Sequence, residues 1–283
     1  MSKNYLIKKN KIYSILKILS QISLIFVVIT LVSIMSFIIT RGISNISLEF
    51  LWGEYNDIPS IKPAIIGTLI LIVSVLFISI PIGIGTSIYL VEYTKKDSKI
   101  LSFIHITIET LAGIPSIIYG LFGYLFFVVY LDLGYSLLGG CLTMTIMVLP
   151  SIISSVEENV LAVPSNYKEG SYALGAGKIQ TIFKIILPCA SRGIVTAIIL
   201  TTGRVISESA VLLLTIGMVV NRIPNGIFSS GTTLALNVYF FGNHGYPEAG
   251  EGTAFVLLIL IVVINLLSSY LGKIFYKGIG ENN

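Results

Sequence analysis

Charged residues are scarce in this 283-residue chain. Asp, Glu, Lys and Arg together make up 11% of it, against about a quarter of a typical soluble domain. Hydrophobic residues make up 54%, and the mean hydropathy is +0.92. So few charges exclude a water-soluble fold of ordinary composition, and the sequence therefore predicts an integral membrane protein.

Cysteine and histidine are also rare. The two cysteines, Cys141 and Cys189, fall in an apolar run and in a basic loop respectively, so we expect no disulfide. Neither has a histidine beside it, so we expect no metal site. The apolar runs contain no paired aspartates, histidine cluster or activated serine, which disfavours an intramembrane enzyme, and we expect no catalytic residue.

Long apolar runs, by contrast, are abundant. A bilayer crossing requires about 20 apolar residues, and the first such run exceeds the apolar region of a signal peptide and lacks a cleavage site after it. We therefore expect an all-α polytopic protein forming one transmembrane domain over residues 1–283. Its six spans are expected at about 18–40, 64–91, 103–131, 133–156, 193–220 and 254–271.

The basic residues alternate between the two sides of these spans. Fourteen Lys and Arg residues lie at the N-terminus, in the 92–102 and 157–192 loops and at the C-terminus, and the alternate loops hold only three: Arg41, Lys62 and Arg222. Because cytoplasmic loops carry the excess of positive charge, both termini are predicted to be cytoplasmic, as an even number of spans requires. Basic residues spread over four short segments do not predict a nucleic-acid surface.

The 157–192 loop contains EGSYALGAGKIQTIFKIILP, residues 169–188, whose Gly177-Lys178 pair suggests a phosphate-binding loop. Such a loop needs an earlier glycine, where Tyr172 stands, and a hydroxyl residue next, where Ile179 stands. These mismatches mean that we do not expect this chain to bind nucleotide.

The same loop instead predicts two short helices. Asn166 with Glu169 fits a capped helix start, and Gly175 with Gly177 fits a break. Four apolar residues then recur at helical spacing as one stripe before Pro188: Ile179, Ile182, Phe183 and Ile186. An apolar stripe outside the bilayer must pack against something, either the headgroup layer and its own bundle or a partner protein.

The loop resembles the EAA loop of ATP-binding-cassette (ABC) importer permeases, although Gly170-Ser171 stands where Ala-Ala is common. The resemblance implies a type I importer permease of six helices with a cytoplasmic coupling helix that docks onto a separate ATPase. ATP and magnesium would be bound by that ATPase, and no cofactor by this chain. The residues that carry the match are Glu169, Gly170, Ser171, Gly175, Ile185, Leu187 and Pro188, of which Glu169 and Gly175 are expected to be essential for docking.

Three further stretches are similar to phosphate importer permeases of the A type: PIGIGTSIYLVEYTKK (81–96), LAGIPSIIYGLFG (111–123) and GRVISESAVLLLTIG (203–217). This resemblance implies import of inorganic phosphate across a bacterial cytoplasmic membrane. It also implies three partners, namely a second homologous permease, two ATP-binding subunits and an extracytoplasmic phosphate-binding protein. An importer of another oxyanion or small solute is the alternative, and a secondary transporter or channel is a more distant one.

Two charged residues lie inside the predicted fifth span. Arg204 is about ten residues into it, or about 15 Å at 1.5 Å per residue, near the middle of a bilayer core about 30 Å thick. Charge at that depth costs about 2.5 kcal/mol or more and is usually functional. Glu208 follows one turn later and is expected to pair with Arg204.

Because a guanidinium fork suits phosphate oxygens, we interpret Arg204 and Glu208 as part of the substrate path. A purely structural ion pair remains the alternative, and Glu208 could also be a gate or a proton-linked group.

Weaker signals are interpreted as structural. His105 and Glu109 are expected to pair near the interface. Three prolines inside spans predict bends, and four glycines predict close helix packing: Pro81, Pro115 and Pro150, and Gly83, Gly85, Gly139 and Gly140. The long outer loop, 221–252, is interpreted either as a re-entrant or interfacial piece that receives a binding protein or as a plain structured loop.

Overall fold

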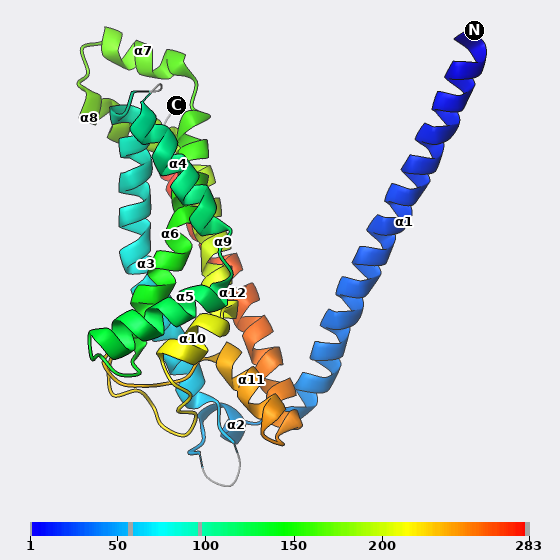
Figure 1. Ribbon diagram of the computed structural model, residues 1–283, viewed down its shortest axis with the longest axis vertical. Helices are drawn as coiled ribbons and strands as arrows, with labels where there is room; N and C mark the ends of the chain where they lie inside the picture. The colour runs from blue at the N-terminus through cyan, green and yellow to red at the C-terminus, as the bar shows by residue number, and fades with distance from the viewer. Residues whose placement is uncertain (1, 56–58, 96–97, 281–283) are drawn as a thin grey trace.

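The computed structural model describes residues 2–55, 59–95 and 98–280, and the side chains of residues 2–12, 14 and 271–280 fall outside the description. Every regular element in these ranges is helical, which confirms the all-α prediction (Figure 1). Most of the basic residues expected at the two termini, together with Lys96, lie outside the described side chains.

The elements in chain order are α1 (Ser2–Gly42), η1 (Ile43–Asn45), α2 (Leu48–Trp52), α3 (Lys62–Ile88), η2 (Tyr89–Tyr93), α4 (Lys99–Ala112), α5 (Ser116–Gly123), η3 (Tyr124–Tyr130), α6 (Leu137–Leu161), α7 (Ser165–Ala173), α8 (Lys178–Thr181), η4 (Ile182–Ile186), α9 (Leu187–Ser207), α10 (Ala210–Thr215), α11 (Leu234–Asn243) and α12 (Pro247–Gly280).

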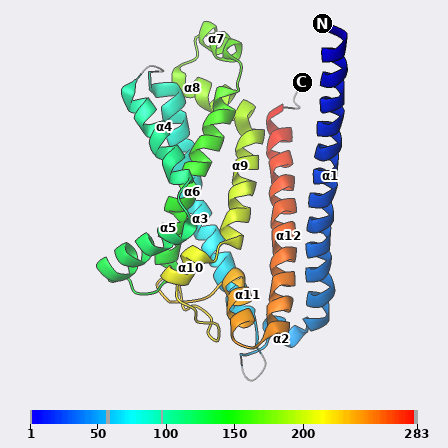
Figure 2. The same ribbon diagram turned by 45° about the vertical axis from the view of Figure 1, so that its right-hand side comes forward.

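Five continuous helical stretches in the described residues are long and apolar enough to cross a membrane: Ile15–Asn45, Lys62–Tyr93, Leu137–Leu161, Lys178–Ser207 and Pro247–Tyr270. A bent pair, α4 with α5–η3, provides a sixth if it is counted as one span. The beginning of α1 and the end of α12 lie at the same end of the molecule as α7 and α8 (Figures 1 and 2). This placement fits an even number of crossings.

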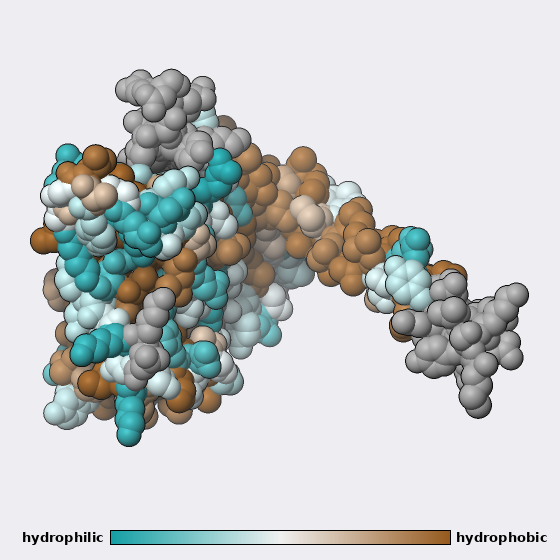
Figure 3. All heavy atoms as spheres, turned by 90° about the horizontal axis from the view of Figure 1, so that it is seen from above, coloured by the Kyte–Doolittle hydropathy of each residue, from teal (hydrophilic) through white to brown (hydrophobic). Residues whose placement is uncertain are grey.

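Helix α6 is the centre of the bundle. Of its most apolar stretch 61% is buried, compared with 11% for α12 and 0% for the first span. Met144, Val148 and Ile152 are fully buried in the main core, where α3, α9, α5 and α10 pack around α6. The first helix instead diverges from the bundle along most of its length and leaves an apolar surface exposed (Figure 3).

The predicted third span, 103–131, is not straight. It breaks between α4 and α5 and bends by 97°. Pro115 stands at the break because proline has no N–H to continue a helix and disfavours helical geometry in the residue before it. The Leu111 carbonyl accepts from the Ile114 N–H at 3.1 Å and from the Tyr119 hydroxyl at 2.8 Å, so it stays hydrogen-bonded at the break. Pro81 and Pro150, in contrast, lie inside continuous helices.

The predicted fifth span, 193–220, is also wrong in its bounds. One continuous helix runs from Lys178 to Ser207, so the second half of the coupling loop is its beginning and is not a separate short helix. The chain then breaks at residues 208–209, forms the short α10 and leaves helical geometry before Gly217, whose φ is +77°.

The outer loop contains a buried helix. Leu234 and Phe241 of α11 are fully buried beside Ile61, and the Leu234 N–H donates to Thr68 Oγ1 of α3 at 2.9 Å. Residues 216–231 are non-helical and bond to the start of α6, where Leu137 N donates to the Ser229 carbonyl at 3.0 Å. The predicted outer loop is therefore packed into the domain.

Close helix packing holds at Gly83 but not at Gly85. A Cβ at Gly83 would lie 2.4 Å from Ile152 Cγ2, whereas one at Gly85 would meet nothing within 4 Å. A Cβ at Gly140 would also clash, because it would lie 2.2 Å from Ile216 Cγ2. A Cβ at Gly139 would have more room.

We expect Gly83→Ala to destabilise the purified protein by about 1–3 kcal/mol, because fully buried Ile152 must shift to admit the methyl group. The measurement is thermal unfolding in detergent. Gly85→Ala, two residues away on the same helix, is the matched control and should be neutral or slightly stabilising. Equal effects of the two substitutions would show that packing at Gly83 is not the cause.

Candidate functional site

Arg204 lies at the level of the middle of α6. Its Nη1 donates to Ser151 Oγ at 3.2 Å, and Ser151 is about 15 Å from the C-terminal end of α6 and about 21 Å from its N-terminal end at 1.5 Å per residue. Since α6 is long and apolar enough to cross a membrane, this contact places the guanidinium near the middle of that candidate span.

Glu208 does not pair with Arg204, contrary to the expectation. Helix α9 ends at Ser207, and Glu208 has extended geometry with ψ of 129°, so the one-turn spacing on which the pairing was based does not exist. Glu208 Oε1 instead accepts from the Val211 N–H of α10 at 3.2 Å. This hydrogen bond attaches the Glu208 side chain to the first turn of α10. A role for Glu208 in the substrate path stays a prediction.

Arg204 thereby keeps most of its donors for other acceptors. A guanidinium has five N–H donors, and among the described residues only Ser151 accepts a side-chain hydrogen bond from it, while no carboxylate lies within ion-pair distance. A half-buried cation with unused donors can bind an oxyanion bidentately.

Sequence reasoning missed Ser151 as part of this site. It directly follows Pro150 and shares one face of α6 with Ser155 and Asn159 at four-residue spacing, a polar ladder that the helical period could have revealed.

His105 pairs with a different residue from the one expected. Its Nε2 lies 3.4 Å from Glu157 Oε1 of α6, whereas Glu109 is exposed. The spacing within one helix predicted a local pair, but α4 packs on α6 and brings in a carboxylate 52 positions away in the sequence. The contact links the inner halves of two helices.

The coupling loop extends from the same end of the molecule as the chain termini (Figure 1). Helix α7 begins at Ser165 after Pro164 and has no side-chain cap bond, so the expected Asn166 cap is wrong. Gly175 has a φ of +82° and open space around it, which produces the expected break. Glu169 is exposed, and Leu174 at the turn is 91% exposed.

The apolar stripe predicted after the turn divides between two faces. Ile182 and Ile186 are buried in the main core, while Ile179 and Phe183 are 66% and 65% exposed. The physical reason is that this segment is the first part of a long span, so one side of it packs on the bundle. The other side, together with Leu174, is left without a partner in the described chain.

An ion pair fixes the coupling loop to the second span. Lys168 Nζ lies 2.5 Å from Glu92 Oε1, and the Glu92 side chain is only 8% exposed. Lys178 Nζ donates to the Glu92 carbonyl and lies 4.2 Å from the centre of the Tyr93 ring. These contacts join α7 and the start of α8 to the end of the second span.

We expect Lys168→Met to destabilise the purified protein by about 1–3 kcal/mol, because it leaves the nearly buried Glu92 carboxylate unpaired. Thermal unfolding measures this change. The double variant Lys168→Met/Glu92→Met removes both charges and should recover most of the loss. A double variant as unstable as the sum of the two single variants would contradict the pairing.

The described residues contain no group of three or more His, Cys, Asp or Glu side chains placed to hold a metal ion. Two features of the described residues remain as functional candidates. They are the guanidinium of Arg204 and the exposed coupling loop.

Comparisons with known proteins identify the family of the chain. Residues 79–281 match the family model described as "Binding-protein-dependent transport system inner membrane component". The chain is 32% identical over 271 residues to "Probable ABC transporter permease protein YqgI" of Bacillus subtilis, covering 89% of this chain and 92% of that protein.

It is also 33% identical over 215 residues to "Phosphate transport system permease protein PstA 2" of Mycobacterium bovis, covering 76% and 70% of the two chains. The fold resembles a chain in the crystal structure of a bacterial alginate ABC transporter in complex with a pentasaccharide-bound periplasmic protein. The TM-score is 0.68 at 14% identity, over 95% of this chain and 98% of that one. The chain thus belongs to the family of binding-protein-dependent transport system inner membrane components, and it is an ABC importer permease that spans the membrane several times.

Proposed function

We propose that this chain is one of two permease subunits of an ATP-driven importer of inorganic phosphate in a bacterial cytoplasmic membrane. The observation that carries the proposal is Arg204, a guanidinium at mid-membrane depth that is held by a neutral hydroxyl at 3.2 Å. A neutral partner leaves the positive charge uncompensated, which favours an anion there. Relatives named phosphate transport permeases support phosphate as that anion.

The coupling loop supplies the energy in this proposal. The exposed residues Leu174, Ile179 and Phe183 form an apolar surface of a kind that docks into a groove on a partner, and the partner would be the separate ATPase. ATP and magnesium would bind there and not to this chain. Closure of two ATPase copies would move α7, and Lys168–Glu92 would carry that motion to the second span.

The remaining partners follow from the topology. With both termini and the coupling loop cytoplasmic, the ordered outer segment 216–243 would face an extracytoplasmic phosphate-binding protein. A second homologous permease would line the other side of the path beside Arg204. Alternating access between the two subunits would then release phosphate inward.

The test is uptake of radiolabelled phosphate at micromolar concentration by cells with and without this chain, in a background that lacks other phosphate transporters. We expect uptake to require the chain and to be unaffected by excess sulfate. Competition by sulfate would indicate a different oxyanion specificity, and uptake that persists without any ATPase subunit would indicate a secondary transporter.

A further inference from the structure

Glu109 is an exposed carboxylate at the depth of Arg204. It lies ten residues into α4, or about 15 Å from the start of that helix. The neighbouring Ile108 packs with Ile153 of α6, and Ile153 is two residues from Ser151. Helix α4 therefore passes the level of the Arg204 contact at this point, with Glu109 on its exposed side.

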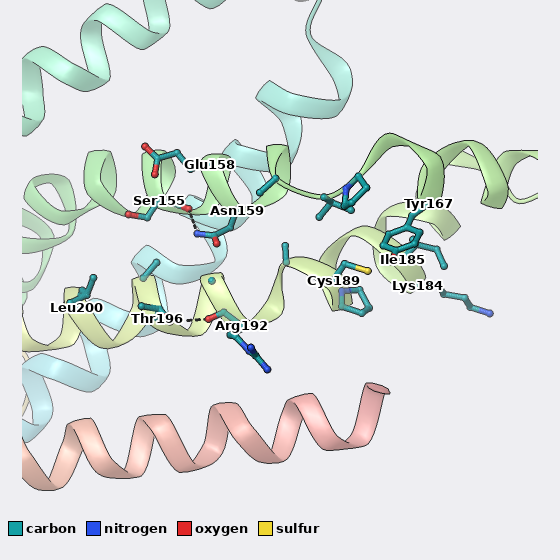
Figure 4. Close-up of a pocket in the computed structure, with 17 residues that line it drawn as sticks. Ser155, Glu158, Asn159, Tyr167, Lys184, Ile185, Cys189, Arg192, Thr196 and Leu200 are labelled. Atoms are coloured by element: carbon teal, nitrogen blue, oxygen red, sulfur yellow. Dashed lines mark hydrogen bonds between the residues drawn. The ribbon is translucent and has the colours of Figure 1, made fainter. Parts of the chain in front are cut away.

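No described residue pairs with this carboxylate. Among the described side chains, no cation lies within ion-pair distance of Glu109, and His105, one turn earlier, pairs instead with Glu157. Arg204 donates to α6, and Arg192 extends from α9 on the side away from α6 (Figure 4). A charge at membrane depth is expensive unless a polar partner or water solvates it. Glu109 therefore needs a group that the described part of the chain does not supply.

The surface around Glu109 is apolar and open. On α4, Phe103 and Ile106 are 70% and 59% exposed. At the start of α5, Ile117 and Ile118 are about half exposed. Such side chains are a poor lining for a water-filled path, and acyl chains alone cannot solvate a carboxylate. The occupant that fits is itself largely apolar and carries a polar or cationic group.

The bend beside Glu109 gives this surface an angular shape. Helix α4 and α5–η3 meet at 97°, and α5–η3 projects sideways from the bundle (Figure 2). At the bend, Gly113 is exposed, and a Cβ there would meet only the carbonyls of its own turn, at 3.5 and 3.7 Å. Ile106, Glu109 and Gly113 follow one another at helical spacing on one side of the chain, and we call them the elbow stripe. A small residue in such a stripe lets a second helix approach closely within a membrane.

We propose that the elbow stripe is a contact surface for a transmembrane helix of the second permease subunit, which contributes a basic side chain to Glu109. The inference rests on the proposed function, because that function supplies the second permease. The first span shows the contrast. It also exposes an apolar surface, but it carries no charge between Ile18 and Thr40, so lipid alone can cover it.

The first test measures what covers the stripe. Ile106→Cys in a Cys189→Ser background takes a nitroxide spin label beside an intact Glu109, while Cys141 is fully buried and stays unlabelled. The chain alone is compared with the complex that contains the second permease and the ATPase subunits, both in phosphatidylcholine vesicles. Oxygen dissolves in lipid, and its access to the label should fall at least threefold on assembly. A water-soluble nickel chelate should reach the label in neither sample.

The matched control is Phe77→Cys in the same background. Phe77 is 79% exposed on α3 and lies outside the elbow stripe, in an apolar run without charge. Oxygen access to a label at this position should be the same with and without the second permease.

The second test addresses the charge. Glu109→Lys should lower the yield of second permease that co-purifies with this chain at least tenfold, because it places like charges opposite each other in the membrane. Glu109→Gln keeps an acceptor and should lower the yield less. Glu49→Lys is the matched charge reversal, at an exposed position of α2 at the outer end, and should leave the yield unchanged.

Each outcome decides the proposal. Unchanged oxygen access at Ile106→Cys on assembly, or an equal fall at Phe77→Cys, would overturn it, and access of the nickel chelate would assign Glu109 to a water-filled path instead. Full yield of the second permease with Glu109→Lys would overturn the charge contact. Normal phosphate uptake by the wild-type complex in these cases would leave the proposed function standing. The expected changes in a complex that imports a different solute would keep the contact surface and reject phosphate as the cargo.

Discussion

Phosphate uptake should fall to the background of cells lacking the chain when Arg204 is replaced by glutamine. Glutamine is neutral and shorter than arginine, so it gives up the charge and the hydrogen bond to Ser151. Because that bond is one side-chain contact among many between α6 and α9, the assembly of the complex should persist. The loss is that of a charge-assisted contact to the anion, which is worth about 2–5 kcal/mol and therefore about 30-fold or more in affinity. The measurement is radiolabelled phosphate uptake together with co-purification of the ATPase subunit.

Two companion variants separate a substrate role from a structural one. Arg204→Lys keeps the charge without the planar fork and should retain partial uptake, since a lysine binds phosphate as a point charge. Ser151→Ala removes the only described side-chain hydrogen-bond acceptor of Arg204 and should reduce uptake less than Arg204→Gln does. Normal uptake by Arg204→Gln would contradict the path role and leave the residue as a structural contact.

Replacement of Gly175 by tryptophan should abolish co-purification of the ATPase subunit and, with it, uptake. Gly175 has a φ of +82°, where an L residue costs about 1–2 kcal/mol, and the turn lies between the exposed Leu174 and the start of the next helix. A bulky side chain there would both strain the turn and block the surface that docks. The readout is the amount of ATPase retained on the purified permease, with ATP hydrolysis measured in parallel.

Gly245 is the matched control for this substitution. It also has a positive φ, +83°, and open space around it, but it lies between α11 and α12 at the opposite end of the molecule from α7 (Figure 1). Gly245→Trp carries the same backbone penalty and should leave ATPase binding intact. Full ATPase yield and activity with Gly175→Trp would refute the assignment of this turn to docking.

The site predictions used two kinds of sequence signal, the backbone geometry of glycine and the spacing of residues along a helix. The structure confirmed the first more often than the second. The break at Gly175 was predicted correctly because glycine adopts a positive φ at little cost, whereas most other residues do not. The predicted pairing of Arg204 with Glu208 was wrong because it assumed that the helix continues through Glu208. No proline or glycine lies between Arg204 and Gly217 to signal in the sequence that the helix ends there.

The same reliance on spacing within one helix explains two other errors. These are the predicted partner of His105 and the single apolar stripe predicted for residues 179–186. Both predictions used spacing within one helix, which determines what shares a face but not which neighbouring element covers that face. The packing of α4 on α6 selected Glu157 as the partner of His105, and the packing of the long fifth span buried Ile182 while exposing Ile179.

The sequence by itself determined that the chain is a helical membrane protein, where most of its spans lie and which loop carries the coupling motif. Apolar run length and glycine backbone geometry are local properties, so they can be read without the fold. Only the tertiary structure decided that Arg204 is held by Ser151, that Glu208 turns toward α10 and that the third span bends at Pro115. These features depend on which helices meet, and helix contacts come from packing between segments that are far apart in the sequence.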